Sequence, residues 1–271
     1  MQVKEVMIKY RRSDKFSIYT LGDTHLGTIH CAEHQLKNKI NEIKKDPMAY
    51  WVGMGDYGDY ITPKDKRWSS GDIAPWVKQD DIGESVRERL RELFEPIKDK
   101  CIGLLYGNHE VSYSKQNDGK VHEHICKDLK LDNLGYSCFI HFIFKRIGST
   151  ESHLIKGFFT HGNGGARTPG AKLNYLRDVM SSFDANIYGY AHVHDIKVHS
   201  PDVLKSTDSL AISAKSKIGA LTGCWFRTYT QGKVASYGEV KVYPPSRIGC
   251  PKFIICPNQG SISVEIPAIE W

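Results

Sequence analysis

The chain has 271 residues, of which 40% are hydrophobic and 25% are charged. These proportions are typical of a globular protein and exclude a chain that is disordered along its length. The net charge of +6, from 37 Lys and Arg against 31 Asp and Glu, permits a polyanionic partner without requiring one. The longest apolar stretch, near residues 138–144, is far shorter than the ~20 residues needed to cross a bilayer, so no membrane partner is expected.

The N-terminus and the cysteines favour a cytoplasmic location. Residues 1–12 mix charged and apolar side chains and lack the continuous apolar core of a signal peptide. The seven cysteines are widely spaced and include no Cys-x-x-Cys pair, so neither a disulfide framework nor a zinc knuckle is expected. We therefore predict a cytoplasmic protein whose cysteines stay reduced.

Apolar periodicity predicts alternating strands and helices up to residue 190. Strands are expected at residues 3–10, 16–21, 50–54, 101–106, 136–147, 153–160 and 186–190. Helices are expected at residues 33–45, 82–99, 119–130 and 171–182. Residues 61–81 interrupt this alternation with prolines, glycines and tryptophans, and we interpret them as a long loop beside the sheet edge.

After residue 194 the chain changes character. Short β-rich pieces are expected at residues 196–199, 210–213, 234–243, 253–256 and 261–266, and no helix is predicted there. Because no linker of disordered composition separates the parts, we predict a single domain over residues 1–271, in which residues 195–271 complete the second sheet. The predicted fold class is α/β, with two packed sheets flanked by helices.

Ligand-type residues follow the ends of five predicted strands. They are Asp23 and His25, Asp56, Asn108 with His109, His161, and His192 with His194. Ligands of α/β sheets bind beyond the carboxyl ends of the strands, so we expect these side chains to meet at one edge.

Five blocks of the sequence, in this order, resemble the signature of calcineurin-like metallophosphoesterases. The blocks are Gly22-Asp23-Thr24-His25, Gly55-Asp56-Tyr57-Gly58-Asp59, Gly107-Asn108-His109-Glu110, His161-Gly162 and Ala191-His192-Val193-His194. The resemblance implies a four-layer αββα sandwich of two mixed sheets, with a dinuclear metal site at the C-terminal ends of the strands. Ala191 departs from the pattern, because the family usually has glycine there. If that position requires a positive φ, alanine adds about 1–2 kcal/mol of strain.

The resemblance also implies a ligand set for two divalent transition-metal ions. Asp56 would bridge the ions, Asp23, His25 and His194 would complete the shell of the first, and Asn108, His161 and His192 that of the second. This mixture of imidazole, carboxylate and amide donors favours manganese, with iron or zinc as alternatives.

The same resemblance implies a catalytic role for His109. Two ions ~3.5–4 Å apart activate a hydroxide and hold the phosphate oxygens, which leaves protonation of the departing oxygen to an imidazole. Asp59 and Glu110 are expected to orient the ligands without binding a metal themselves.

Three stretches are candidates for substrate binding. The first is the acid-free, glycine-rich segment 163–172, whose Arg167 and Lys172 we predict to bind substrate; a tight turn into the next helix is the alternative interpretation. The second is Lys64-Asp65-Lys66-Arg67-Trp68, with Trp76 further on, which either follows a nucleic-acid strand or is solvated surface. The third is residues 223–229, whose Trp225 and Phe226 either approach the site or pack in the core.

From these features we predict a metal-dependent phosphoesterase that hydrolyses phosphodiester bonds. Basic and aromatic side chains together favour a nuclease acting on DNA or RNA. The alternatives are a small-nucleotide or cyclic-nucleotide phosphodiesterase, a phosphomonoesterase, and a non-catalytic interaction scaffold of the same fold. His109 argues against the scaffold, because no structural role demands a histidine there. The sequence leaves the oligomeric state open.

Overall fold

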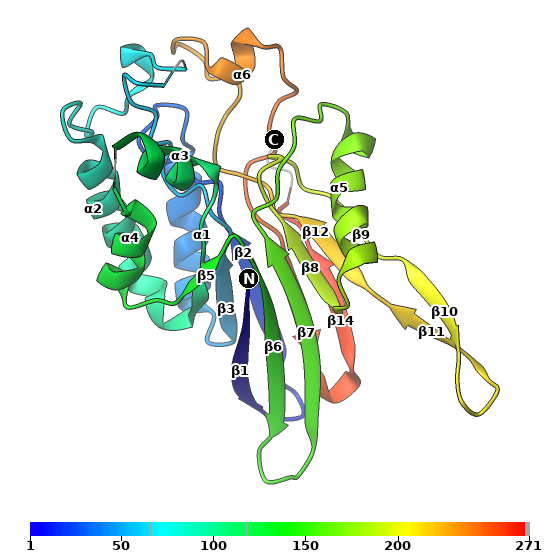
Figure 1. Cartoon of the computed structure of the whole chain (residues 1–271). Coiled ribbons are helices and arrows are strands. Elements are labelled where there is room, and N and C mark those ends of the chain that lie inside the picture. Colours follow the sequence, from blue (N-terminus) through cyan, green and yellow to red (C-terminus); the bar gives the residue numbers. More distant parts are fainter. Residues whose placement is uncertain (66, 118, 269–271) are drawn as a thin grey trace.

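The computed structural model describes residues 1–65, 67–117 and 119–268. Within these ranges the strands form two six-stranded sheets and one separate hairpin. Sheet A has the order β1 (Gln2–Tyr10), β6 (Ser137–Arg146), β7 (Ser152–Thr160), β8 (Ile187–Tyr190), β12 (Ile218–Leu221) and β9 (Val198–His199). Sheet B has the order β14 (Ser261–Glu265), β13 (Lys252–Cys256), β2 (Phe16–Leu21), β3 (Ala49–Gly53), β4 (Cys101–Leu105) and β5 (Asn133–Gly135). The hairpin of β10 (Asp202–Ser206) and β11 (Ile212–Ser216) projects from the body (Figure 1).

Helices cover the outer faces of the two sheets or lie beyond the ends of their strands (Figure 1). They are α1 (Glu33–Lys45), α2 (Ile82–Phe94), α3 (Asn108–Asn117), α4 (Val121–Leu129), α5 (Pro169–Ser182) and α6 (Tyr237–Val240), with short 3₁₀ turns at Ser70–Asp72, Glu95–Lys100 and Pro257–Gln259. One apolar core lies between sheet B and helices α1, α2 and α4, a second lies between the sheets, and a third lies under α5. The predicted αββα sandwich of two mixed sheets is therefore confirmed (Figure 1).

The register of the strands brings their carboxyl ends to one edge. In sheet B, β2, β3 and β4 are parallel, and Leu21 pairs with Gly53, which pairs with Leu104. In sheet A, β7 and β8 are parallel, with Thr160 opposite Tyr190. The residues that follow these strands therefore leave the sandwich side by side, because strands in register end at the same level.

The last third of the chain contributes to both sheets, since β9 and β12 lie in sheet A while β13 and β14 lie in sheet B. The strand predicted at residues 234–243 is wrong. Ser236 caps α6 there, accepting a hydrogen bond from the backbone N–H of Glu239 at 3.1 Å. Val242 then takes a positive φ of 54°, which a strand does not allow.

One helix boundary and one whole helix also differ from the prediction. The helix expected at 82–99 ends at Phe94 and continues as a 3₁₀ turn, where Pro96 has no N–H to extend it. Helix α3, which begins at Asn108, was not predicted. Among the described residues, no helix combines the length and the apolar character that crossing a membrane requires.

Candidate metal centre and adjoining pocket

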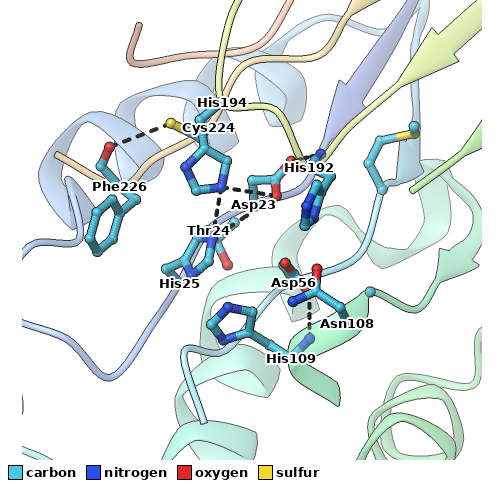
Figure 2. A network of polar contacts seen from close by, with 12 residues as sticks. Asp23, Thr24, His25, Asp56, Asn108, His109, His192, His194, Cys224 and Phe226 are labelled. Carbon is cyan, nitrogen blue, oxygen red and sulfur yellow. Dashed lines mark hydrogen bonds and ion pairs between the residues drawn. The ribbon is translucent and has the colours of Figure 1, made fainter. Parts of the chain in front are cut away.

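The strand ends bring the predicted ligand residues together. Asp23 and His25 follow β2, Asp56 follows β3, Asn108 follows β4, His161 follows β7, and His192 and His194 follow β8. In Figure 2 most of these side chains point toward a common centre. Among the described residues, three groups of three side chains each bring one possible metal-ligand atom per residue within 4.8 Å of the others. They are Asp23, His25 and His194; His25, Asp56 and His109; and Asp56, His161 and His192.

The first group surrounds one carboxylate oxygen. Asp23 Oδ1 lies 3.4 Å from His194 Nε2 and 4.0 Å from His25 Nε2, and the two Nε2 atoms are 3.1 Å apart. His25 Nδ1 lies 3.0 Å from Asp59 Oδ1. Because a carboxylate only accepts hydrogen bonds, Asp59 holds the proton on Nδ1 and leaves His25 Nε2 as a lone-pair donor facing Asp23.

The third group, of Asp56, His161 and His192, is built in the same way. His161 Nε2 lies 3.2 Å from Asp56 Oδ2 and 3.1 Å from Asn108 Oδ1. His161 Nδ1 donates a hydrogen bond to the carbonyl oxygen of Met54 at 2.8 Å. Nε2 is therefore the ring nitrogen that faces the cluster and would bind a metal ion. Asp56 belongs to two of the three groups, which is the position that a carboxylate shared by two cations would occupy.

The backbone is strained where the ligands sit. Asp23, His25, Asp56, His192 and His194 all have positive φ values, between 46° and 69°. Side chains other than glycine rarely adopt this region, and such strain gathers at functional sites where surrounding contacts fix it. Here Asp23 N donates to Gly55 O at 2.8 Å and His25 N to Asp56 O at 3.1 Å. Ala191 is not among the residues with positive φ, so alanine adds no strain of that kind.

Buried charge in the cluster fits divalent cations. Burial raises the pKa of Asp56, but the facing imidazoles of His161 and His109 outweigh it and hold this pKa well below its usual range. Burial lowers the pKa of His161, yet the carboxylates of Asp56 and Asp23 raise it to about 10. Asp23 Oδ1 and His192 Nδ1 are buried and have no hydrogen-bond partner among the residues that the structure describes. Oxygen and imidazole ligands without a thiolate suit manganese, iron or zinc, so the residues fit a pair of such ions.

His109 lies beside the cluster. Its backbone N–H donates to Asp56 Oδ1 at 2.8 Å, and its ring is edge-on to that of His25 at 4.7 Å. His109 Nδ1 donates to the carbonyl oxygen of Asp59, which leaves Nε2 as the nitrogen available for proton transfer. Burial lowers the pKa of His109, but Asp56 and Asp59 outweigh it and raise this pKa.

A pocket of about 300 Å³ adjoins the cluster, and both predicted substrate residues line it. Lys172 is buried on α5, with Nζ 3.8 Å from Asp195 Oδ2. Arg167 is exposed, and its guanidinium lies 4.8 Å from the centre of the Tyr243 ring.

In each of the other two candidate substrate-binding stretches, some residues line the pocket and others pack in the core. Arg67 and Trp68 line the pocket, although Arg67 forms a bidentate pair with Asp65 at 2.8 and 3.1 Å. Trp76 instead packs against the core, and Lys66 lies outside the described residues.

In the third stretch, Phe226 lines the pocket with its ring 5.3 Å from that of His25, while Trp225 is buried in the core. Tyr237 and Tyr243 also line the pocket and were not predicted from the sequence. No local pattern marks them, because they reach the site through the path of the last third of the chain.

No protein-family model matches the sequence, and no curated protein matches it significantly. One similar solved structure is a conserved uncharacterized protein of Streptococcus pneumoniae TIGR4, a predicted phosphoesterase. It is 11% identical, with 89% of this chain and 83% of that chain covered and a TM-score of 0.32. Another is wild-type Vps29 of Entamoeba histolytica in complex with Zn²⁺, which is 12% identical, with 92% of this chain and 97% of that chain covered and a TM-score of 0.29. At this distance, neither likeness assigns an activity to this chain.

Proposed function

We propose that the chain is a metal-dependent phosphoesterase that hydrolyses phosphodiester bonds. The observation that carries this proposal is the convergence of imidazole groups on Asp56, beside a second carboxylate whose buried Oδ1 has no hydrogen-bond partner. A buried carboxylate oxygen that accepts no hydrogen bond is costly unless a cation faces it. Two divalent ions, manganese by preference and iron or zinc as alternatives, would therefore be held by the ligand set predicted from the sequence.

Such ions would supply Lewis-acid chemistry, binding phosphate oxygens and making a water molecule more acidic. The water releases a proton to solvent as its oxygen adds to phosphorus, the P–O bond to the departing group breaks, and the departing oxygen takes a proton. His109 is the proposed source of that proton. The carbonyl of Asp59 fixes the ring through Nδ1, so Nε2 is the nitrogen that donates.

The pocket supports a phosphodiester that carries a nucleoside. Its volume is at the lower end of the ~300–1,000 Å³ range for small-molecule sites, and its walls combine aromatic and cationic side chains. A nucleic-acid strand is the second candidate, favoured by the positive charge of Arg167, whose contacts in the pocket are with a carbonyl oxygen and an aromatic ring. A non-catalytic scaffold would hydrolyse neither.

Metal content and hydrolysis, measured together, test the proposal. We expect about two ions per chain after loading with Mn²⁺, and hydrolysis of bis-p-nitrophenyl phosphate that excess chelator abolishes. Asp56→Asn should lose metal and activity, whereas Asp99→Asn, the same change at an exposed carboxylate, should keep both. Fewer than one ion per chain, or full activity in chelator, would reject the proposal. A preference for p-nitrophenyl phosphate would favour a phosphomonoesterase.

A further inference from the structure

Two contacts of Arg167 join two walls of the pocket that are far apart in the sequence. Arg167 Nη2 donates a hydrogen bond to the carbonyl oxygen of Lys241 at 3.1 Å. The same guanidinium lies 4.8 Å from the centre of the Tyr243 ring, within the range of a cation–π interaction. Arg167 belongs to the loop that follows His161, whereas Lys241 and Tyr243 follow α6, which lies above the strand ends (Figure 1). The contacts therefore connect one wall of the pocket to the other.

The wall after α6 is held in place by its own hydrogen bonds. Ser236 Oγ donates to the carbonyl oxygen of Thr228 at 2.6 Å, and Ser236 also caps α6. Tyr229 donates its hydroxyl hydrogen to the carbonyl oxygen of Tyr243 at 2.9 Å. Tyr243 is thus positioned without any help from Arg167.

The opposite wall is anchored at its two ends, and Gly164 between them packs against the Tyr175 ring. Asn163 is held by Tyr190, whose hydroxyl accepts from Asn163 N at 2.9 Å and donates to Asn163 O at 2.6 Å. At the other end, Thr168 caps α5. Between them, Gly164 has a φ of 134°, and a Cβ added to Gly165 would meet nothing within 4 Å. Gly165 gives the backbone conformational freedom just before Arg167. The contacts of Arg167 are therefore needed to hold this part of the segment over the pocket.

We propose that Arg167 and Tyr243 form a latch that roofs the pocket, and that the roofed pocket is a chamber for a terminal nucleobase of the substrate. Trp68 and Phe226 supply aromatic side chains inside the same pocket, and its volume of about 300 Å³ suits one planar group better than a strand. Phe226 also lies next to His25, so a base in the chamber would place its own phosphate near the candidate metal centre.

This inference rests on the proposed phosphodiesterase function and adds the substrate class. A chamber closed on its outer side admits the end of a chain or a small diester and excludes an internal nucleotide. Arg167 then acts as a positioning residue, because its contacts with Lys241 and Tyr243 hold its own segment over the chamber.

Hydrolysis of two p-nitrophenyl diesters tests whether the chamber binds a nucleobase. The two share the leaving group and differ only in the other ester, which is thymidine or methyl. We expect the wild-type protein to prefer the thymidine 5′ ester over the methyl ester, as a ratio of kcat/KM. Arg167→Ala and Tyr243→Ala should each lower this ratio by roughly 3- to 10-fold, and the double variant should fall no further, because both remove one contact. Arg167→Lys keeps the charge but loses the planar guanidinium, so it should fall like Arg167→Ala.

Arg177→Ala is the matched control, because it removes one positive charge from an exposed position on α5 outside the pocket. Its ratio should equal that of the wild-type protein. Additive losses in the double variant, or an unchanged ratio in Arg167→Lys, would overturn the latch and leave Arg167 as a simple charge.

A binding measurement tests the chamber without hydrolysis and without variants. Thymidine 5′-monophosphate and ribose 5-phosphate share a phosphate but only the first has a base, so the Mn²⁺-loaded wild-type protein should bind the first at least roughly 5-fold more tightly. Equal affinities would overturn the chamber even if both diesters are hydrolysed. Tighter binding of the thymidine compound without hydrolysis of either diester would instead reject the proposed function and keep the chamber.

Discussion

The carboxylate of Glu110 accepts a hydrogen bond from the backbone N–H of Asp56 at 2.9 Å through Oε2. The same oxygen accepts from Gly107 N at 2.8 Å, and Oε1 accepts from Tyr57 N at 2.7 Å. Glu110 is only 1% exposed and lies in the first turn of α3. One side chain therefore ties the turn after β3 to the turn after β4, and so fixes Asp56 relative to Asn108.

The first prediction concerns this tie. Glu110→Gln replaces one accepting oxygen by an NH₂ group, which then faces backbone donors and leaves them unsatisfied. The variant should lose about 1–3 kcal/mol of unfolding free energy and bind Mn²⁺ roughly 10- to 100-fold more weakly. Urea denaturation and metal titration measure the two effects. Glu123→Gln, an exposed position on α4, is the control, and identical metal affinity in both variants would contradict the role given to Glu110.

The second prediction concerns His109 as the proton donor. His109→Ala should retain most of the bound metal but lower kcat by roughly 10²- to 10⁴-fold on a dinucleotide, whose departing alkoxide needs a proton. The loss should be smaller on bis-p-nitrophenyl phosphate, because its leaving group departs readily without protonation. Kinetics on both substrates, with metal content determined on the same samples, provide the measurement. If both substrates lose the same factor, His109 is not the acid.

The candidate metal centre could be read from the sequence because each part of it is local. A strand that ends in Gly-Asp or in His-Gly carries its own signal, and parallel strands in register then bring the ends together. The positive φ of Asp23 or His192 could not be predicted, since hydrogen bonds from other segments impose it.

The outer wall of the pocket could not be predicted for a different reason. Phe226 reaches His25 because it pairs with Cys31 in an isolated bridge, a contact between the first and the last third of the chain. Helix α6 is a single turn of four residues, too short to repeat an apolar position at helical spacing, so the alternation of Val234 to Tyr243 resembles a strand. Helix α3 was missed because only His109 and Glu110 are buried on it, and neither is apolar.

The third prediction is a pH dependence of stability that arises away from the candidate site. His122 on α4 is 6% exposed, and burial lowers its pKa to about 4, against an ordinary value of 6.5. The folded state therefore disfavours the charged ring. The contribution of the neutral His122 ring to the free energy of unfolding is full above pH 6.5. It is lost as the pH falls from 6.5 toward 4, at about 1.4 kcal/mol per pH unit and by about 3 kcal/mol in total.

Denaturation at a series of pH values measures this loss. His122→Gln should flatten the dependence between pH 6.5 and 4 relative to the wild-type protein. His124→Gln, an exposed position on the same helix, provides the comparison and should keep the wild-type dependence. An unchanged slope in His122→Gln would mean that other buried groups account for the whole effect.

The last prediction uses salt to separate the charge of Arg167 from its latch. Arg167 contacts a carbonyl oxygen and an aromatic ring, so no carboxylate offsets its charge in these contacts. Lys172 lies 3.8 Å from Asp195, which also lies 3.4 Å from Lys197. If a strand places a phosphate beside the pocket, Arg167→Ala should make the salt dependence of binding shallower by about 0.7, the value for one phosphate contact on single strands. Lys172→Ala should change it less.

The measurement is the affinity for a ~20-nucleotide single strand across salt concentrations, in a His109→Ala background so that the strand survives. Arg167→Lys should keep the wild-type slope, because it keeps the charge, although the same variant should lose the preference for a thymidine ester. A slope that stays at the wild-type value in Arg167→Ala and Lys172→Ala would remove both side chains from a nucleic-acid surface. Small diesters would then be the remaining substrates, because a ligand confined to the chamber has no second phosphate for either side chain to bind.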